Sequence, residues 1–483
     1  MKHELREIAF WLILVFLLAF GVVFGVKIAS AQPQCDFYAS PTGAGTVGSA
    51  ANPFKISEFW NVAGPGSTLC LMDGVYTGAD SMINPTPGMS GTAAGRITIR
   101  ALNDGMVKID GQGFHRPIYL ENSDYFVIEG MNAANSSATV VQLNDSDYNI
   151  VRRVVAWDAA DGGNHKIFQV TNGGSSPQTD GHNLLEDVAG FGIARKTFSS
   201  YTANHTTIRR AWGSWDGSHY HGPKMTFTLA YNNTNAIYEN VIGTWTGSRL
   251  TSATDQMQAV IGTDGLHDSQ QLANSKLLGS IGYVRSSPTY CPNGVNRITQ
   301  PDGVHWENVV SYVEPGDCTI DTRAVGMLNF NRPCCGLPTQ RTVTNATAIG
   351  GEGNSYHGST LTNVVEYATI ADMTAAGVNI YTGATGAKVC KRYVDGVLTD
   401  EPLWPWPMNQ RIIDAMIDAG RTPVDVTAEV ETMFGAIPAE CKTAPDVDPK
   451  QQFCDDMSNM MQQTMAVLIT DMNNLVTNFC SAN

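Results

Sequence analysis

Apolar and polar residues follow the same order in two stretches of the chain. Residues 120–128 read LENSDYFVI and residues 143–151 read LNDSDYNIV, so the second copy starts 23 positions after the first (143 − 120). Each copy has a short apolar strand, a polar bend and a second apolar strand. This repeating unit predicts one coil of a solenoid built from parallel β-strands.

The second strand of this unit recurs with a regular pattern of charge. Its copies begin at residues 127, 150, 184, 207, 237 and 305. Equivalent residues of adjacent coils lie about 4.8 Å apart, where opposite charges pair and like charges repel. We therefore interpret Arg152, Arg209 and Arg210 as members of a structural ion ladder rather than as substrate ligands. One column reads Glu129, Arg152, Glu186, Arg209 and Glu239, and the next reads Gly130, Arg153, Asp187, Arg210 and Asn240.

Segments at both ends depart from the repeat. Residues 53–60 predict a short amphipathic helix over the first coil, where a cap protects the open sheet end. Residues 391–440 interrupt the coils, and residues 409–419 within them predict a helix with an apolar face. We interpret this part as a C-terminal cap. Residues 457–479 contain no Pro or Gly and predict a helix in the tail that follows.

The first turns of the chain carry the motifs of a known fold family. A Ser-Pro-x-Gly loop starts at Ser40, a Pro-Gly-x-Thr turn at Pro65 and a Gly-x-Tyr strand at Gly74, with the short helix between the first two. This order resembles pectate-lyase-like β-helix proteins and is most similar to the alginate-lyase/chondroitinase-B and bacterial pectate-lyase branches. The resemblance implies an all-β, single-stranded right-handed parallel β-helix with an N-terminal helical cap and a C-terminal helical cap or tail. The same scaffold serves lyases, hydrolases, epimerases and adhesins, so it does not define the activity.

The first 31 residues predict export. Lys2, His3 and Arg6 precede an apolar run over residues 8–26, and Ala29-Ser30-Ala31 gives a small-x-small cleavage site. An uncleaved membrane anchor is the alternative, because the run is nearly long enough to span a bilayer. We expect a secreted, extracellular or periplasmic protein without membrane contact after cleavage. Its expected parts are a signal peptide (1–31), an N-terminal cap with the first strands (32–76), the β-helix (77–390), a C-terminal cap segment (391–445) and a helical tail (446–483).

The ten cysteines predict disulfides, because an exported chain meets an oxidising environment. Pairing of neighbours favours Cys35–Cys70, Cys291–Cys318 and Cys390–Cys441. No Cys-x-x-Cys spacing is present, which disfavours a zinc site.

The formal net charge of −15 disfavours nucleic acid as a partner. It also opposes general attraction to an acidic polysaccharide, so that such a partner requires a locally basic site.

Basic residues do gather at the start of the first strand in several coils. Aligned on the bend, residues 116–120, 166–170 and 196–200 stack, and no acidic residue occurs in the columns at their start. We expect unpaired cations there that bind an anion, although the same residues could instead tie down the corner loops. The edge carries His115, Arg116, His165, Lys166, Arg195 and Lys196.

The resemblance to uronate lyases implies roles for this edge. In those families Lys and Arg of the first sheet act as base and neutralise the substrate carboxylate, sometimes with Ca²⁺. β-Elimination needs a cation at the carboxylate, a base for the α-proton and an acid for the leaving oxygen. We assign Lys196 as base, Arg195 as neutralising group and Tyr201 as acid. No metal ligands are specified, and the expected substrate-binding residues are Lys166, His165, Arg116, His115, His219 and His221.

The leading prediction is a polysaccharide lyase that cleaves a uronate-containing polymer. The chain nevertheless lacks the Trp-x-Asp-His and Arg-x-Pro-x-x-Arg segments of well-marked pectate lyases, and the Gly-His-Gly segment of polygalacturonases. A non-catalytic β-helix that serves adhesion, surface structure or sugar binding is the alternative. The Met-rich tail, with Cys454 and Cys480 at its ends, favours this alternative because it suits self-association.

Overall fold

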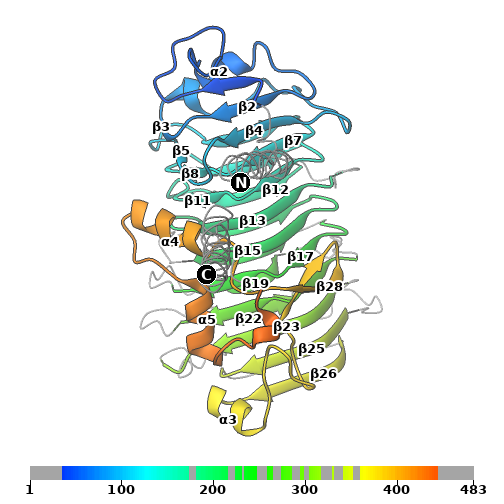
Figure 1. The fold of residues 1–483 in the computed structure, drawn as a ribbon. Coiled ribbons are helices and arrows are strands. Elements are labelled where there is room, and N and C mark those ends of the chain that lie inside the picture. The colour runs from blue at the N-terminus through cyan, green and yellow to red at the C-terminus, as the bar shows by residue number, and fades with distance from the viewer. Residues whose placement is uncertain are drawn as a thin grey trace, which may run out of the picture.

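Parallel strands stack coil upon coil along one axis (Figure 1). The computed structural model describes residues 35–172, 181–215, 224–230, 233–246, 258–264, 274–285, 294–298, 304–316, 329–330, 341–351 and 359–443. The expected signal peptide, the tail beyond residue 443 and the Cys291–Cys318 pair lie outside the described residues. In the described ranges no helix is long and apolar enough to cross a membrane.

The coils build two sheets, a small sheet of eight strands that begins at Ile118 and a large sheet of 18 strands to which a coil gives one long or two short strands. The small sheet contains β6 (Ile118–Glu121), β9 (Val141–Asn144), β12 (Lys166–Thr171), β14 (Lys196–Tyr201), β16 (Lys224–Ala230), β19 (Gln258–Asp264), β22 (Gly294–Ile298) and β24 (Asn329–Phe330). The large sheet contains β1 (Phe37–Ala39), β2 (Thr68–Leu71), β3 (Gly74–Tyr76), β4 (Ile97–Ala101), β5 (Val107–Asp110), β7 (Phe126–Glu129), β8 (Asn132–Ala134), β10 (Ile150–Arg152), β11 (Val155–Trp157), β13 (Leu184–Phe191), β15 (Thr207–Trp215), β17 (Ile237–Glu239), β18 (Ile242–Trp245), β20 (Lys276–Leu278), β21 (Ile281–Val284), β23 (His305–Val313), β25 (Arg341–Ile349) and β26 (Ser359–Tyr367).

Every pairing within these two sheets is parallel, as shown by the contacts of β10 with β7 and of β12 with β9. Connections between parallel strands of one sheet are right-handed almost without exception. The protein is a right-handed parallel β-helix, as the resemblance implied.

A left-handed backbone position bends each coil within the large sheet. Asp187, Arg210 and Asn240 occupy it with φ of 52°, 48° and 49°. Such angles strain most side chains, while Asn and Asp tolerate them best. The bend separates two faces of the large sheet. We call the outer side of β8, β11, β18, β21 and the second halves of β13 and β15 the lateral face.

The predicted ion ladder is present. Arg152 lies opposite both Glu129 and Glu186, and Arg209 lies opposite Glu186 and Glu239. Arg152 Nη2 lies 3.1 Å from Glu129, while Arg209 lies 3.2 Å from Glu186 and 2.5 Å from Glu239. These contacts confirm that Arg152 and Arg209 belong to the scaffold.

The N-terminal cap has the predicted helix, although it is short. The helix α2 (Ile56–Phe59) buries both of its terminal residues against the first coils. The Cys35–Cys70 disulfide joins the start of the described chain to β2, as predicted. Inside the solenoid, Phe168, Phe198 and Phe227 of three successive coils stack at 4.7 and 4.6 Å between ring centroids.

The C-terminal segment covers the last coil and then returns along the lateral face (Figure 1). It comprises α3 (Ile370–Ala375), β27 (Lys391–Val394), β28 (Val397–Pro402), α4 (Asn409–Asp418) and α5 (Val426–Phe434). Helix α3 contacts β26, whereas Asp418 of α4 pairs with Lys108 at 2.8 Å, far back in the solenoid. The observed α4 matches the helix expected at 409–419.

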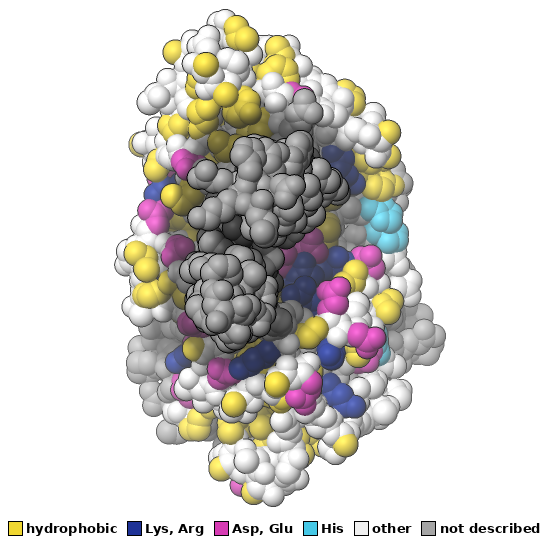
Figure 2. All heavy atoms as spheres, viewed as in Figure 1, with side chains coloured by type: hydrophobic (Ala, Val, Ile, Leu, Met, Phe, Trp, Pro, Cys, Tyr) yellow, Lys and Arg dark blue, Asp and Glu magenta, His cyan; other side chains and the backbone are white. Residues whose placement is uncertain are grey.

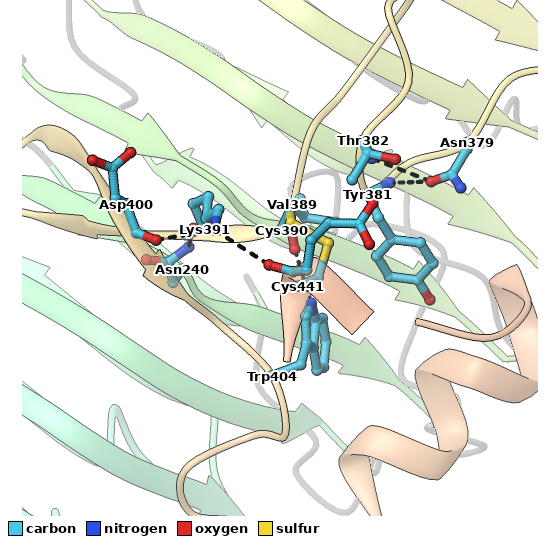
Figure 3. Close-up of a disulfide and its surroundings, with 11 residues drawn as sticks. Asn240, Asn379, Tyr381, Thr382, Val389, Cys390, Lys391, Asp400, Trp404 and Cys441 are labelled. Carbon is cyan, nitrogen blue, oxygen red and sulfur yellow. Dashed lines mark hydrogen bonds between the residues drawn. A yellow bond between two sulfur atoms is a disulfide. The ribbon is translucent and has the colours of Figure 1, made fainter. Parts of the chain in front are cut away.

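A second hydrophobic core joins this segment to the lateral face. Trp404 and Trp406 are buried in it together with Trp212 of β15. The predicted Cys390–Cys441 disulfide closes the segment, and beside it the Trp404 indole donates to the carbonyl of Val389 at 2.9 Å (Figure 3).

Candidate functional site

The small sheet aligns its strand starts as the sequence indicates. Lys166 lies opposite Lys196. Ile118 and Phe168 both lie opposite Val141, so Arg116 and Lys166 hold equivalent positions two residues before that column. The corner loops add backbone contacts, since the Arg195 N–H donates to the carbonyl of His165 at 3.0 Å. The expected basic residues from 115 to 196 therefore share one edge.

The expectation that these cations are unpaired is wrong for Lys166, Arg195 and Lys196. Lys166 and Lys196 are each only 4% exposed, and the Lys166 ammonium donates to the carbonyl of Asn164 at 2.8 Å. Lys196 and Arg195 also have partners. A buried ammonium must be compensated because the loss of hydration is costly. Sequence columns could not show this for Lys166, because its acceptor, the carbonyl of Asn164, belongs to a corner loop.

Four basic residues of the edge are half-buried rather than enclosed, namely His115, Arg116, His165 and Arg195. Burial, the Lys166 ammonium and the Arg116 guanidinium all lower the pKa of His165. A lowered pKa leaves the imidazole neutral at pH 7, the form that accepts a proton. Gly163 has a φ of +70°, and a Cβ there would lie 3.0 Å from His165 Nε2, so glycine leaves room for this ring.

Tyr119 belongs to the same edge, although it was not among the expected site residues. The guanidinium of Arg116 lies 4.6 Å from the centre of the Tyr119 ring. Burial, followed by the hydrogen bond and charge of Glu121, raises the pKa of Tyr119, so the phenol stays protonated. The available signal was its position, because it lies within the aligned segment 116–120 that carries Arg116.

Tyr201 lies further along the solenoid. The strand pairing places Glu121, Asn144, Thr171 and Tyr201 in one column, as expected. Three coil steps of about 4.8 Å separate Tyr201 from the coil of Arg116. Tyr201 thus shares a coil with Lys196. His219 and His221 lie outside the described residues.

An open groove of about 600 Å³ runs along the loops that lead into these strands. Asp110 accepts a hydrogen bond from the Asn135 amide at 3.0 Å, and Asp158 accepts one from the Ile193 N–H at 2.8 Å. The groove is acidic, although the neighbouring edge is basic. It is lined by Asp110, Gln112, Gly113, Asn135, Ser136, Ser137, Asp158, Ala159, Ala160, Asp161 and Ile193.

On the face shown in Figure 2, basic and acidic side chains lie next to one another at several places. Among the described residues, no group of three or more His, Cys, Asp or Glu side chains is arranged to hold a metal ion. No described residue is therefore assigned as a Ca²⁺ ligand.

Comparison with known proteins adds little to this site. No protein-family profile and no curated protein matches the chain. Similar solved structures include the pectate lyase Pel9A, with 12% identity, a TM-score of 0.45 and coverage of 68% of this chain and 78% of that one. An alginate lyase from Paenibacillus sp. str. FPU-7 has 14% identity, a TM-score of 0.40 and coverage of 61% and 98%.

A lacto-N-biosidase from Eubacterium ramulus is also similar, with 10% identity, a TM-score of 0.38 and coverage of 68% of this chain and 66% of that one. Likenesses of this size carry no argument about activity, and a β-helix hosts several chemistries. The strand pairing of the chain itself establishes that it is a right-handed parallel β-helix.

Proposed function

We propose that the protein is a polysaccharide lyase that cleaves a uronate-containing polymer by β-elimination at the edge formed by Arg116, Tyr119 and His165. The observation that carries this proposal is the half-buried imidazole of His165 on one edge of the small sheet, whose pKa is lowered by burial and by the charges of Lys166 and Arg116. That arrangement combines a site for a carboxylate with a base.

Each group has a defined task in the reaction. Arg116 neutralises the carboxylate and so acidifies the proton on the adjacent carbon. His165 takes that proton. The electron pair of the broken C–H bond forms a C=C bond as the neighbouring C–O bond breaks, and the Tyr119 hydroxyl protonates the leaving oxygen. The buried Lys166 favours the neutral form of His165.

This assignment changes the expected base. Lys196 is too enclosed to reach a polymer unless neighbouring groups move. Its charge and that of Lys166 instead contribute to the positive potential beneath the edge, and the half-buried Arg195 adds to it nearer the surface. Export to an extracellular or periplasmic space is part of the proposal, and it is supported by the Cys35–Cys70 and Cys390–Cys441 disulfides.

The test is ultraviolet absorbance of the unsaturated product, with alginate, pectate and chondroitin as substrates, in the presence and absence of Ca²⁺. His165→Gln should lower the rate by about 10²–10⁴-fold, the usual contribution of a general base. His305→Gln is the matched control, because His305 is a half-buried histidine on the large sheet. It should retain full activity.

Two results would overturn the assignment. Full activity of His165→Gln together with loss of activity in Lys196→Ala would return the role of base to Lys196. Absence of product from folded protein with every polymer would reject the lyase.

Non-catalytic sugar binding is the second candidate, and the burial of Lys166 and Lys196 favours it. It predicts that polymers bind to the protein without forming product.

A further inference from the structure

The C-terminal segment reaches the corner loops of the basic edge through Arg421. This residue follows α4, and its backbone N–H donates to the carbonyl of Met416 at 2.8 Å, near the end of that helix. Helix α4 itself lies against β11 (Figure 1). Arg421 Nη2 donates to Asp158 Oδ1 at 2.7 Å, and its guanidinium lies 5.7 Å from the centre of the Phe191 ring. The last part of the described chain thus contacts the loop that leads into β12.

Arg421 also lines a cavity of about 660 Å³ between the lateral face and the C-terminal segment, in which α5 forms one wall. The charged residues of this lining are two arginines and two carboxylates, namely Arg285, Arg421, Asp425 and Glu429. Arg285 pairs with Glu429, and Asp425 accepts the backbone N–H of Ala428 at 2.8 Å. These charges are balanced and hold the segment to the solenoid, and Arg421 connects them to the basic edge.

Asp158 joins the corner loops of two adjacent coils at their starts. It opens the loop 158–165 between β11 and β12, and the loop 192–195 lies between β13 and β14. The carboxylate oxygen that binds the guanidinium also accepts the Ile193 N–H at 2.8 Å. In the reverse direction, the Ala159 N–H donates to the carbonyl of Ile193 at 2.8 Å. A single side chain therefore links the starts of both loops to the C-terminal segment.

The same two loops are joined again at their other ends, where the basic edge begins. There the Arg195 N–H donates to the carbonyl of His165 at 3.0 Å. Only Ala194 separates Ile193 from Arg195. Because each residue has only two soft backbone dihedrals, a displacement of Ile193 must also move Arg195. The position of the edge thus depends on the contact that Asp158 makes at the start of the loops.

The backbone leaves room for this contact at Gly192. Its φ is +89°, a conformation that glycine adopts readily, and a Cβ there would collide with Asp158 Oδ1 and lie 3.1 Å from Arg421 Nη2. The two side chains of the pair are only 28% and 22% exposed. Partial burial weakens screening by salt, and an ionised donor and acceptor give a stronger hydrogen bond than neutral groups do. The pair is therefore a built part of the fold.

We propose that Arg421 is a positioning residue for the basic edge: it holds Asp158, and through Asp158 it fixes the two corner loops that place His165 and Arg195. Its chemical consequence rests on the proposed lyase function, in which this edge is the site of reaction. Catalytic side chains must be held within about 0.5 Å of the productive geometry. The C-terminal segment thereby contributes to the site from the opposite end of the corner loops.

Hydrogen exchange of the full exported chain, followed by mass spectrometry at single-residue resolution, tests the proposal without a substrate. Arg421→Gln should speed the exchange of the Ile193 and Arg195 N–H groups about 5–10-fold, because the loops lose the support of one hydrogen bond. Arg421→Lys keeps a cation beside Asp158 and should restore most of the protection.

Asp418→Asn is the matched control. Asp418 belongs to α4 of the same segment and pairs with Lys108 of β5 at 2.8 Å, outside both corner loops. This variant should leave the exchange of both N–H groups unchanged. The proposal is overturned if Arg421→Gln does not speed their exchange, or if Asp418→Asn speeds it equally, because the arginine would then only help to hold the segment.

A kinetic measurement tests the consequence for the reaction. With a cleaved uronate polymer, Arg421→Gln should lower kcat about 10-fold and change KM less, because a displaced base affects the reaction step more than binding. Arg421→Lys should recover most of kcat, and Asp418→Asn should match the wild type. An unchanged kcat in Arg421→Gln would also overturn the proposal. Absence of cleavage by the wild type would instead reject the lyase and leave the exchange result standing, so the two failures are distinguishable.

Discussion

The titration of His165 illustrates how residues from different coils act on one another. Its pKa lies below the ordinary value of about 6.5, because burial, Lys166 and Arg116 each disfavour the protonated ring. The base should therefore remain active until the pH falls below about 6.5. The unfolded chain binds this proton more readily, so His165 should also reduce stability as the pH falls through that value.

We predict that Arg116→Gln raises the pKa of His165. The substitution removes a cation that penalises the imidazolium, so the protonation midpoint must move to higher pH. A titration of the ring by nuclear magnetic resonance measures this without relying on activity. Arg96→Gln serves as control, because Arg96 lies over Tyr125 at the other end of the small-sheet strands. An unchanged or lower midpoint in Arg116→Gln would contradict the prediction.

The buried part of the ion ladder should matter more than its exposed part. Glu239 is fully buried and accepts hydrogen bonds from Arg209 and from the Gly396 N–H at 2.8 Å. Glu239→Gln leaves Arg209 with less compensation and should lower the free energy of unfolding by about 3 kcal/mol. Arg152→Gln, whose side chain is 43% exposed, should cost less than about 1 kcal/mol. Urea denaturation compares the two, and equal losses would refute the distinction.

At the scale of elements, the bend of the large sheet anchors the C-terminal segment. The Asn240 side chain accepts the Tyr393 N–H at 2.6 Å and donates to the carbonyl of Lys391 at 3.2 Å. Asn308, in the same column, donates to the Tyr393 hydroxyl at 2.6 Å. These asparagines therefore tolerate the left-handed backbone of the coil and also hold β27 against it.

Two substitutions separate these roles of Asn240. Asn240→Gly keeps the freedom to adopt a φ of 49° but loses the hydrogen bonds, and it should cost about 1–3 kcal/mol. Asn240→Ala loses the hydrogen bonds and also adopts this left-handed φ less readily, so it should cost about 1 kcal/mol more than Asn240→Gly. Thermal unfolding measures the difference. If alanine were no worse than glycine, backbone strain would not contribute at this bend.

Short-range pattern was sufficient to predict several elements. The helix at 409–418 follows from its own apolar spacing, and the ladder of Glu129, Arg152 and Glu186 follows from the coil repeat. The path of the C-terminal segment was not predictable in this way. It depends on side-chain contacts such as Asp418 with Lys108, which are 310 residues apart.

Over the whole molecule, the acidic chain carries a small basic edge beside an acidic groove and a cavity of balanced charge. Net charge alone conceals this arrangement. The cavity exists only because α5 and the loop before it return to the lateral face and meet strands formed far earlier in the chain. The alignment of the basic edge therefore depends on the stacking of coils, whereas the cavity depends in addition on the docking of the final segment.

The sequence by itself determined the β-helix, the register of its coils, two of its disulfides and the edge on which the basic residues gather. These properties arise from a repeat, and each coil adds the same hydrogen bonds and packing as the one before. Only the tertiary structure decided which basic residues are enclosed and which are accessible. Lys166 and Lys196 became buried while Arg116 and Tyr119 stayed nearer the surface, because burial depends on loops and segments that are distant in sequence and carry no repeat.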